Sequence, residues 1–383
     1  MTRTAEDIPD ATLRLLLAPR AGAVLIGRLR EHFGSDEAIV AAPASHLAEV
    51  RGLAAGSAAA LRHAIADAEP ACERQRITAG GARLIVRGDD DYPALLEAIP
   101  DPPAALWIRG HLDESDLLSV AVVGARRCTA YGREQAGRLS SLLGESGLTI
   151  VSGGAAGIDG EAHRGALRVG ARTIAVSGCG LAIAYPPEHR ELFERIVDAG
   201  GALLSEYPMS MAPLAAHFPH RNRIISGLSV GVLVIEAARR SGALITARRA
   251  AEEHGREVMA LPGRVDSPAS AGCLRAIREG WAALVTNHAD VLCQLDASSQ
   301  LVRGALEAAG QTGATHTATL FDKNLTEGQQ AIVETLRDAN GPLSVDRLAT
   351  ACELPLSRVL ADLTLLEIRG RVRQAGDGVR LHR

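Results

Sequence analysis

Continuous apolar runs alternate with amphipathic helical segments through the middle of this 383-residue chain, and this alternation limits the possible folds more than any other feature. Runs rich in Val, Ile and Leu are typical of strands buried on both faces, as in parallel sheets covered by helices. We expect strands at Leu118–Val123, Leu148–Ser152, Arg172–Ser177, Ala202–Ser205, Val230–Glu236, Glu257–Leu261 and Ala282–Val285. We expect helices at Arg133–Leu143, Gly160–Val169, Glu188–Ala199, Leu244–Glu253 and Leu274–Glu279. The sequence therefore predicts an α/β fold with a doubly wound parallel sheet.

The length predicts two or three domains. Residues 1–75 have the pattern of a small helical domain, and residues 76–295 form the α/β core, in which the segment 84–112 is expected to pack on the sheet as an extension. Residues 296–324 are a polar linker. Residues 325–383 follow the three-helix and hairpin order of a winged helix. Arginines and acidic residues balance in this last segment, so contact with another protein is at least as reasonable an interpretation as contact with DNA.

Composition excludes several classes of protein. With 47% hydrophobic residues the chain can bury a core, and a net charge of −4 means that any site for a polyanion must be a local patch. Lys323 is the only lysine, so neither a phosphate-binding P-loop nor a Schiff-base lysine is expected in the core. The six cysteines form no C-x-x-C pair, which predicts no disulfide framework and no zinc site. No signal-peptide pattern or membrane-spanning apolar stretch is present, which predicts a cytoplasmic protein.

Glycine turns follow four of the predicted strands. They are Gly124-Ala125-Arg126, Ser152-Gly153-Gly154, Gly178-Cys179-Gly180 and Ser241-Gly242, the last opening a helix that contains Thr246 and Arg248. Glycine lets backbone N–H groups approach an anion closely, and the first turn of a helix adds partial positive charge. Because ligands bind beyond the carboxyl ends of parallel strands, the turns predict a track for a phosphate backbone.

The run from His217 to Ser229 places Phe218 beside Arg221, Asn222 and Arg223, in a chain with only 3% aromatic residues. An aromatic ring offers a face on which a nucleobase can stack, and a guanidinium group offers a planar fork to phosphate oxygens. The alternative is a core phenylalanine with solvated arginines beside it. The neighbouring glycine turns favour the nucleic-acid interpretation.

The sequence supports a catalytic site less well than it supports a nucleic-acid site. The first turn lacks the G-x-G-x-x-G fingerprint of dinucleotide-binding folds, so no NAD or ATP cofactor is expected. Asp159 and His163 can form an acid–base or metal pair, but a helix-start acid with a packed neighbour is the better interpretation. Glu206 and Glu236 can form a carboxylate pair, but we expect them to orient arginines or to accept backbone amides. We therefore predict a protein that is not an enzyme and that holds no metal.

Taken together, these motifs resemble the DNA-processing protein A (DprA/Smf) family. The resemblance rests on Gly124-Ala125-Arg126, Ser152 through Asp159 with His163, Gly178-Cys179-Gly180-Leu181 with Tyr185-Pro186, Ser205-Glu206-Tyr207-Pro208, Phe218 through Ile225, Ser241 through Ala247, and Pro262-Gly263. It implies a protein that binds single-stranded DNA in natural transformation and recombination, protects the incoming strand and helps to load the RecA recombinase. It also implies an extended Rossmann-like core that forms a homodimer, with a sterile-alpha-motif-like N-terminal domain and a C-terminal winged helix.

The resemblance also implies a DNA pocket. Its residues would be Arg126, Ser152, Gly153, Gly154, Gly178, Gly180, Phe218, Arg221, Asn222, Arg223, Ser241, Gly242, Thr246 and Arg248. The sequence departs from the family pattern at Leu274 and Trp281, near the expected dimer contacts. The alternative function is a nucleotide-processing enzyme of the related phosphoribohydrolase fold, but Pro262-Gly263 is followed by Arg264-Val265 and not by that family's glycine-rich turn.

Overall fold

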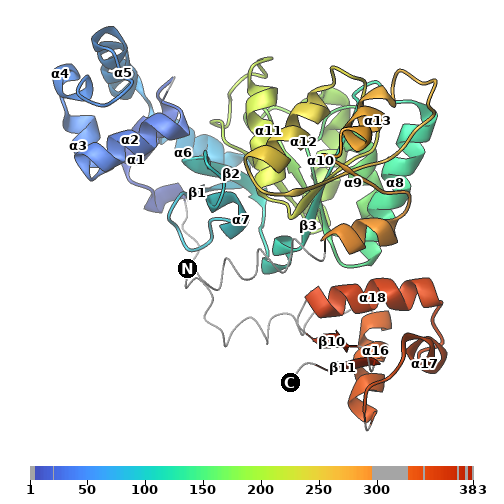
Figure 1. Cartoon of the computed structure of the whole chain (residues 1–383). Coiled ribbons are helices and arrows are strands. Elements are labelled where there is room, and N and C mark those ends of the chain that lie inside the picture. The colour runs from blue at the N-terminus through green and yellow to red at the C-terminus, as the bar shows by residue number, and fades with distance from the viewer. Residues whose placement is uncertain are drawn as a thin grey trace.

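The computed structural model of the chain describes residues 5–19, 21–295, 327–339, 341–368, 371–375 and 378–381. The predicted linker at 296–324 lies outside these residues. Figure 1 shows the described elements in chain order.

A nine-stranded sheet forms the centre of the fold, in the order β1-β2-β6-β5-β4-β3-β7-β8-β9. The strands are β1 (Ala82–Val86), β2 (Ala105–Gly110), β3 (Ser119–Val123), β4 (Thr149–Ser152), β5 (Thr173–Val176), β6 (Ala202–Ser205), β7 (Gly231–Val234), β8 (Glu257–Ala260) and β9 (Ala283–Leu284). The strands β3 to β9 are parallel to one another, and all seven were predicted. The predicted Rossmann-like sheet is therefore confirmed.

The segment 84–112 joins the sheet in a way that the sequence did not predict. The strands β1 and β2 pair antiparallel, and β2 pairs antiparallel with β6. The short helix α7 (Ala94–Glu97) connects them. The segment is an extension of the sheet, as expected, but it is joined to the sheet beside β6 by backbone hydrogen bonds and is not packed on top of it.

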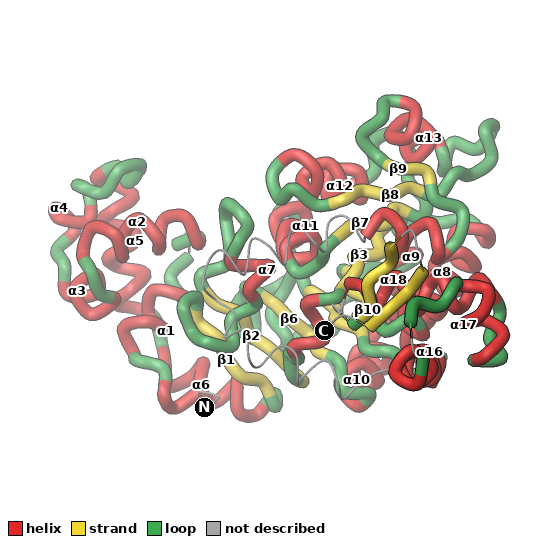
Figure 2. Tube along the Cα trace, turned by 60° about the horizontal axis from the view of Figure 1, so that its bottom comes forward, coloured by secondary structure: helices red, strands yellow, loops and turns green. Residues whose placement is uncertain are grey.

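Helices cover both faces of the sheet. One face carries α11 (His217–Gly227), α12 (Gly242–Glu252) and α13 (Ala271–Arg278), and the other carries α8 (Ala130–Glu145), α9 (Ile158–Arg168) and α10 (Arg190–Asp198), as Figures 1 and 2 show. Alternate side chains of each strand supply the two layers, so that Ala121 and Val123 of β3 face α11 and α12 whereas Val120 and Val122 face α8 and α9. Short 3-10 helices lie at η1 (Ala5–Asp7), η2 (Glu114–Leu117) and η3 (Pro187–His189).

The N-terminal helices form a separate cluster with its own apolar core, built around Leu15, Leu29, Leu47 and Leu61. They are α1 (Asp10–Leu17), α2 (Ala23–Phe33), α3 (Asp36–Ala41), α4 (Ala44–Leu47) and α5 (Ala55–Asp67). The next helix, α6 (Pro70–Ala79), packs its Ile77 in the cluster that covers the β1–β2 end of the sheet. The predicted boundary at residue 75 therefore falls inside a helix that belongs with the core.

The C-terminal segment has the predicted winged-helix order. It comprises α16 (Glu327–Asp338), α17 (Val345–Ala351), α18 (Leu356–Ile368), β10 (Val372–Ala375) and β11 (Gly378–Leu381). Ile332, Leu348, Leu363 and Val379 join these elements in one apolar cluster. Across the whole described part of the chain, no helix is both long and apolar enough to cross a membrane.

Candidate functional site

A groove of about 800 Å³ lies beyond the carboxyl ends of β3 and β7. The chain leaves β3 towards β4 on one side and continues from β7 towards β8 on the other, so the two loops diverge here. Such a switch point in strand order is where open α/β sheets bind ligands. The loop after β3 (Val123–Arg127), the loop after β7 with the start of α12 (Ala238–Ala243), and the first turns of α11 line the groove.

Phe218 lies at the centre of the groove with cationic and aromatic neighbours. Its ring centroid is 5.2 Å from that of Tyr185, and the guanidinium carbon of Arg126 lies 5.0 Å above the Phe218 ring. Phe218 is half-buried, whereas Tyr185 and Arg126 are exposed. Arg126 makes no ion pair with any residue in the described ranges. A planar ligand and an anion can therefore both be accommodated at this point.

Arg221 forms the floor of the groove and is almost completely buried, at 2% exposure. One of its terminal nitrogens, Nη1, donates to the carbonyl oxygens of Gly153, at 2.7 Å, and Val176. Burial lowers the pKa of Arg221 to about 10, and the nearby Asp159 carboxylate opposes this shift. Burial likewise raises the pKa of Asp159 to about 6, against the effect of Arg221. The Arg221 hydrogen bonds thus join the loop after β4 and the end of β5 to α11.

The loop after β3 is held in place by Glu236, which follows β7. Its carboxylate accepts hydrogen bonds from the backbone N–H of Thr129 at 2.7 Å and from the Thr129 hydroxyl at 2.8 Å. Gly157, at a φ of 82°, opens α9 against the same loop, where a side chain would collide with the carbonyl oxygens of Ala125 and Arg126. The position of Arg126 is therefore set by contacts from two neighbouring strands.

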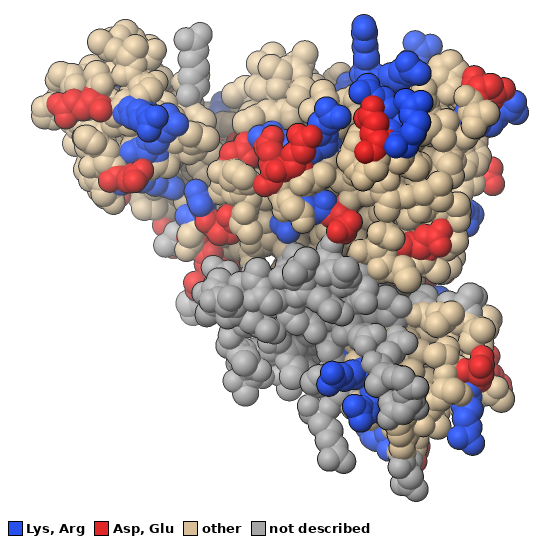
Figure 3. Space-filling view, viewed as in Figure 1, with Lys and Arg blue, Asp and Glu red and all other residues tan. Residues whose placement is uncertain are grey.

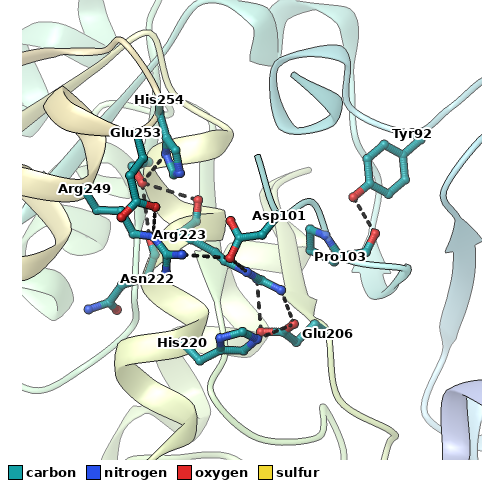
Figure 4. Close-up of polar contacts among 11 residues, drawn as sticks. Tyr92, Asp101, Pro103, Glu206, His220, Asn222, Arg223, Arg249, Glu253 and His254 are labelled. Carbon is teal, nitrogen blue, oxygen red and sulfur yellow. Dashed lines mark hydrogen bonds and ion pairs between the residues drawn. The ribbon is translucent and has the colours of Figure 1, made fainter. Parts of the chain in front are cut away.

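A second arginine of α11, Arg223, points away from the groove into an ion-pair network (Figure 4). Its side chain is 0% exposed and pairs with Glu206 at 2.6 Å and with Asp101 at 3.1 Å. Arg249 of α12 also binds Asp101, at 2.8 Å. The network connects α11 and α12 to the loop after β6 and to the connection between α7 and β2.

One group near this network has the donor types of a metal site. Ligand atoms of Asp101, Glu253 and His254 lie within 4.8 Å of one another. Arg249 binds both carboxylates, however, at 2.8 Å and 2.7 Å. The guanidinium groups of Arg223 and Arg249 thus already supply the cationic charge that these carboxylates require.

Comparison with known proteins identifies this arrangement. The family model described as DNA recombination-mediator protein A matches residues 83–296, and the model of the DprA winged helix domain matches residues 317–378. The chain belongs to the DNA recombination-mediator protein A family. The resemblance inferred from the sequence motifs is therefore confirmed.

Several members of this family, which we call the DprA family, cover most of the chain. The protein Smf from Synechocystis is 37% identical to it, over 92% of this chain and 93% of its own length. The DNA processing protein DprA from Streptococcus pneumoniae is 47% identical over 54% of this chain and 72% of its own length. The X-ray structure of the pneumococcal DprA covers 77% of this chain and 99% of that one, with a TM-score of 0.64 and 36% identity.

Seven of the fourteen residues expected in the DprA-type pocket line the groove: Arg126, Phe218, Arg221, Asn222, Ser241, Gly242 and Thr246. They come from three separate segments of the sequence: the loop after β3, α11 and the start of α12. Ser241 also caps α12 by accepting a hydrogen bond from the N–H of Ala243, which directs the start of that helix at the groove.

The structure places the other seven outside the groove. Ser152 is buried and donates to the carbonyl oxygen of Val122, and Gly180 packs against the backbone of Pro208 and Met209. Gly178 lies beneath Phe218, where an added Cβ would sit 2.7 Å from the ring. The remaining four are Arg223, in the network described above, Gly153 and Gly154, which lie towards a second cavity, and Arg248, which stacks on Trp281.

Arg248 lines a neighbouring cavity of about 560 Å³ between α12 and α13. Its guanidinium carbon is 5.4 Å from the Trp281 ring centroid. Figure 3 shows basic side chains gathered at the upper edge of the core, on the side where α12 and α13 lie in Figure 1. Positive charge therefore accumulates locally in a chain whose net charge is −4.

Among the groove residues that were not predicted as site residues, Arg127, Tyr185 and Arg240 offer basic or aromatic side chains. Tyr185 carried a signal, because it belongs to a Tyr-Pro pair in the family motif and is one of only four tyrosines. For Arg127 and Arg240, the only indication in the sequence was that each comes shortly after a predicted strand. All three side chains are exposed.

The interpretations of the carboxylates are confirmed. Asp159 lies in the first turn of α9 and accepts a hydrogen bond from the N–H of Ala155, while His163 is buried against the Thr173 hydroxyl at 2.8 Å. Burial lowers the pKa of His163 to about 3, so its ring is neutral. Glu206 orients Arg223 and Glu236 accepts the Thr129 amide, as expected.

Proposed function

We propose that this chain binds single-stranded DNA in the groove beyond β3 and β7. The observation that carries the proposal is the half-buried Phe218 ring between Arg126 and the exposed Tyr185. A base that stacks in this cluster would place its phosphate near Arg126 and near the capped start of α12. Stacking tolerates every base, so the binding should depend little on sequence.

We further propose that the protein acts without catalysis, helps to load the RecA recombinase and forms a homodimer through the core, as the family resemblance implies. The commitment of Glu206 and Glu236 to structural contacts supports a binding role over nucleotide hydrolysis. A cytoplasmic location is consistent with these partners. Co-precipitation with RecA and sedimentation velocity would test the two protein contacts.

The decisive test of DNA binding is the salt dependence of the Arg126→Ala variant. Arg126 is exposed and makes no ion pair with the described residues, so its removal should cost a phosphate contact without disturbing the fold. The slope of log K against log salt should flatten by about 0.7 for a single strand. Fluorescence anisotropy with oligo-dT across salt concentrations measures this slope, and Arg195→Ala, an exposed arginine of α10 away from the groove, is the matched control. Equal slopes for Arg126→Ala and the control would contradict the proposal.

The winged helix should contribute little to single-strand affinity. Its Arg358 is committed to the buried Asp362 at 2.9 Å, which removes one cation from the helix that a winged helix would present to DNA. A chain ending at Leu295 keeps every groove residue and should bind oligo-dT nearly as tightly as the full chain. Anisotropy titrations of both chains on single-stranded and duplex DNA measure the difference. A loss of about tenfold or more on the single strand, about 1.4 kcal/mol, would refute this prediction.

A further inference from the structure

A second cavity, of about 430 Å³, lies beside the groove beyond β5. This volume is within the range of about 300–1,000 Å³ that is usual for small-ligand sites. The loop after β5, the end of α6, the strand β2 and the start of α10 line it.

The cavity has an excess of positive charge. Three arginines line it, Arg76, Arg109 and Arg190, from three different elements, and Glu194 is the one acidic residue in its lining. Arg109 is paired with Glu194 through two contacts, at 3.0 Å and 2.6 Å. Arg190 is exposed and has no ion-pair partner among the described residues. An anion can therefore gain a guanidinium contact here without displacing an existing pair.

An aromatic ring accompanies these charges. Phe193 lines the cavity, is half-buried, and lies one turn along α10 from Arg190. Its ring also lies against Gly154, where an added Cβ would be 2.8 Å from it. An aromatic face beside an unpaired arginine repeats the chemistry of Phe218 and Arg126 in the groove, and this combination suits a nucleotide.

The boundary between the two cavities is thin. Arg221 lines the groove and Gly153 lines the second cavity, yet the two are in direct contact, with Arg221 Nη1 donating to the Gly153 carbonyl at 2.7 Å. Ile183 and Ala184 line the second cavity, and the next residue, Tyr185, lines the groove. Because Ala184 and Tyr185 are consecutive residues, and an extended polypeptide spans only about 3.3–3.6 Å per residue, a DNA strand that passes the exposed Tyr185 ring comes directly to the second cavity.

We propose that the second cavity is a nucleotide subsite that continues the single-strand path beyond Tyr185, with Arg190 contacting a phosphate and Phe193 stacking on a base. This inference rests on the proposed DNA-binding function. It extends the footprint of the strand from the α11–α12 side of the sheet to α10.

An oligonucleotide length series tests the subsite. Oligo-dT probes of increasing length are titrated by anisotropy against the wild type, Arg190→Ala and the control Arg195→Ala on the same helix. Arg190→Ala should match the control for the shortest probes that bind, and should lose several-fold in affinity, with a salt slope flatter by about 0.7, once the probe is long enough to pass Tyr185. The subsite would be overturned if Arg190→Ala and Arg195→Ala had the same affinity at every probe length. It would also be overturned if Arg190→Ala lost the same amount of affinity at every probe length.

A second variant, which should raise affinity for the long probes instead of lowering it, gives an independent test. Glu194→Gln frees Arg109 from its exposed ion pair, which itself contributes little to stability. It should therefore raise affinity for the long probes only, and an unchanged affinity for them would count against the subsite. Failure of the underlying DNA-binding function looks different, because the wild-type chain would then bind no probe of any length.

Discussion

Arg223→Ala should lower the stability of the core by about 3–5 kcal/mol, because it leaves the Glu206 carboxylate buried without its guanidinium partner. The melting temperature should fall by about 2–4 °C for each kcal/mol, as is usual for a domain of this size. Thermal unfolding followed by circular dichroism measures the shift. Arg239→Ala, an exposed arginine on the same side of the core, is the control and should melt like the wild type.

This expectation differs from the one that the sequence suggested, in which Arg223 contacts a phosphate. The two roles have separate signatures. A structural Arg223 lowers the melting temperature and leaves the salt slope of the folded fraction unchanged, whereas a phosphate-binding Arg223 would leave the melting temperature unchanged and flatten the slope. An Arg223→Ala variant that melts like the Arg239→Ala control would refute the role assigned by the ion-pair network.

Phe218→Ala should weaken single-strand binding by about 1–3 kcal/mol, the usual cost of removing a ring on which a base stacks. Because the ring is half-buried, the fold should survive this change. Anisotropy with oligo-dT measures the loss, and Phe218→Tyr, which keeps the ring, is the control. Gly178→Ala should also weaken binding, since its new methyl group would press on the Phe218 ring from below. Unchanged affinity in Phe218→Ala would remove the main support for the proposed function.

The sequence predicted the parallel sheet well because the strands β3 to β8 are almost entirely buried on both faces and leave uninterrupted apolar runs, whereas the edge strand β9 is partly exposed. The sequence analysis did not predict the helix α11, because this segment lacks a regular hydrophobic pattern. The segment His217–Gly227 begins with a proline in its first turn and carries two arginines, so no amphipathic period is visible. The proline is compatible with the helix because the amide that it lacks would have no intrahelical partner at this position.

The burial of the two arginines could not be predicted either, because their partners are distant in the sequence. Arg221 binds Gly153, 68 residues away, and Arg223 binds Asp101, 122 residues away. An arginine beside a phenylalanine looks the same in the sequence whether it faces solvent or a carboxylate. The exposed Arg126 lines the groove as predicted because it follows directly after a predicted strand, whereas the contacts from Glu236 and Gly157 that fix its loop could not be read from the sequence.

The ion pair between Arg223 and Asp101 limits how far the chain can be shortened from its N-terminal side. The alternating α/β pattern starts at β3, and the pattern alone would suggest a fragment that begins just before this strand. Asp101 lies upstream of that starting point, and Leu96 and Ile99 from the same stretch pack against Gly227 at the end of α11. The smallest fragment that keeps these contacts to α11 therefore begins before Leu96, and the region shared with the family, which starts at residue 83 within β1, includes them. The antiparallel edge and the groove are thus inherited as one unit.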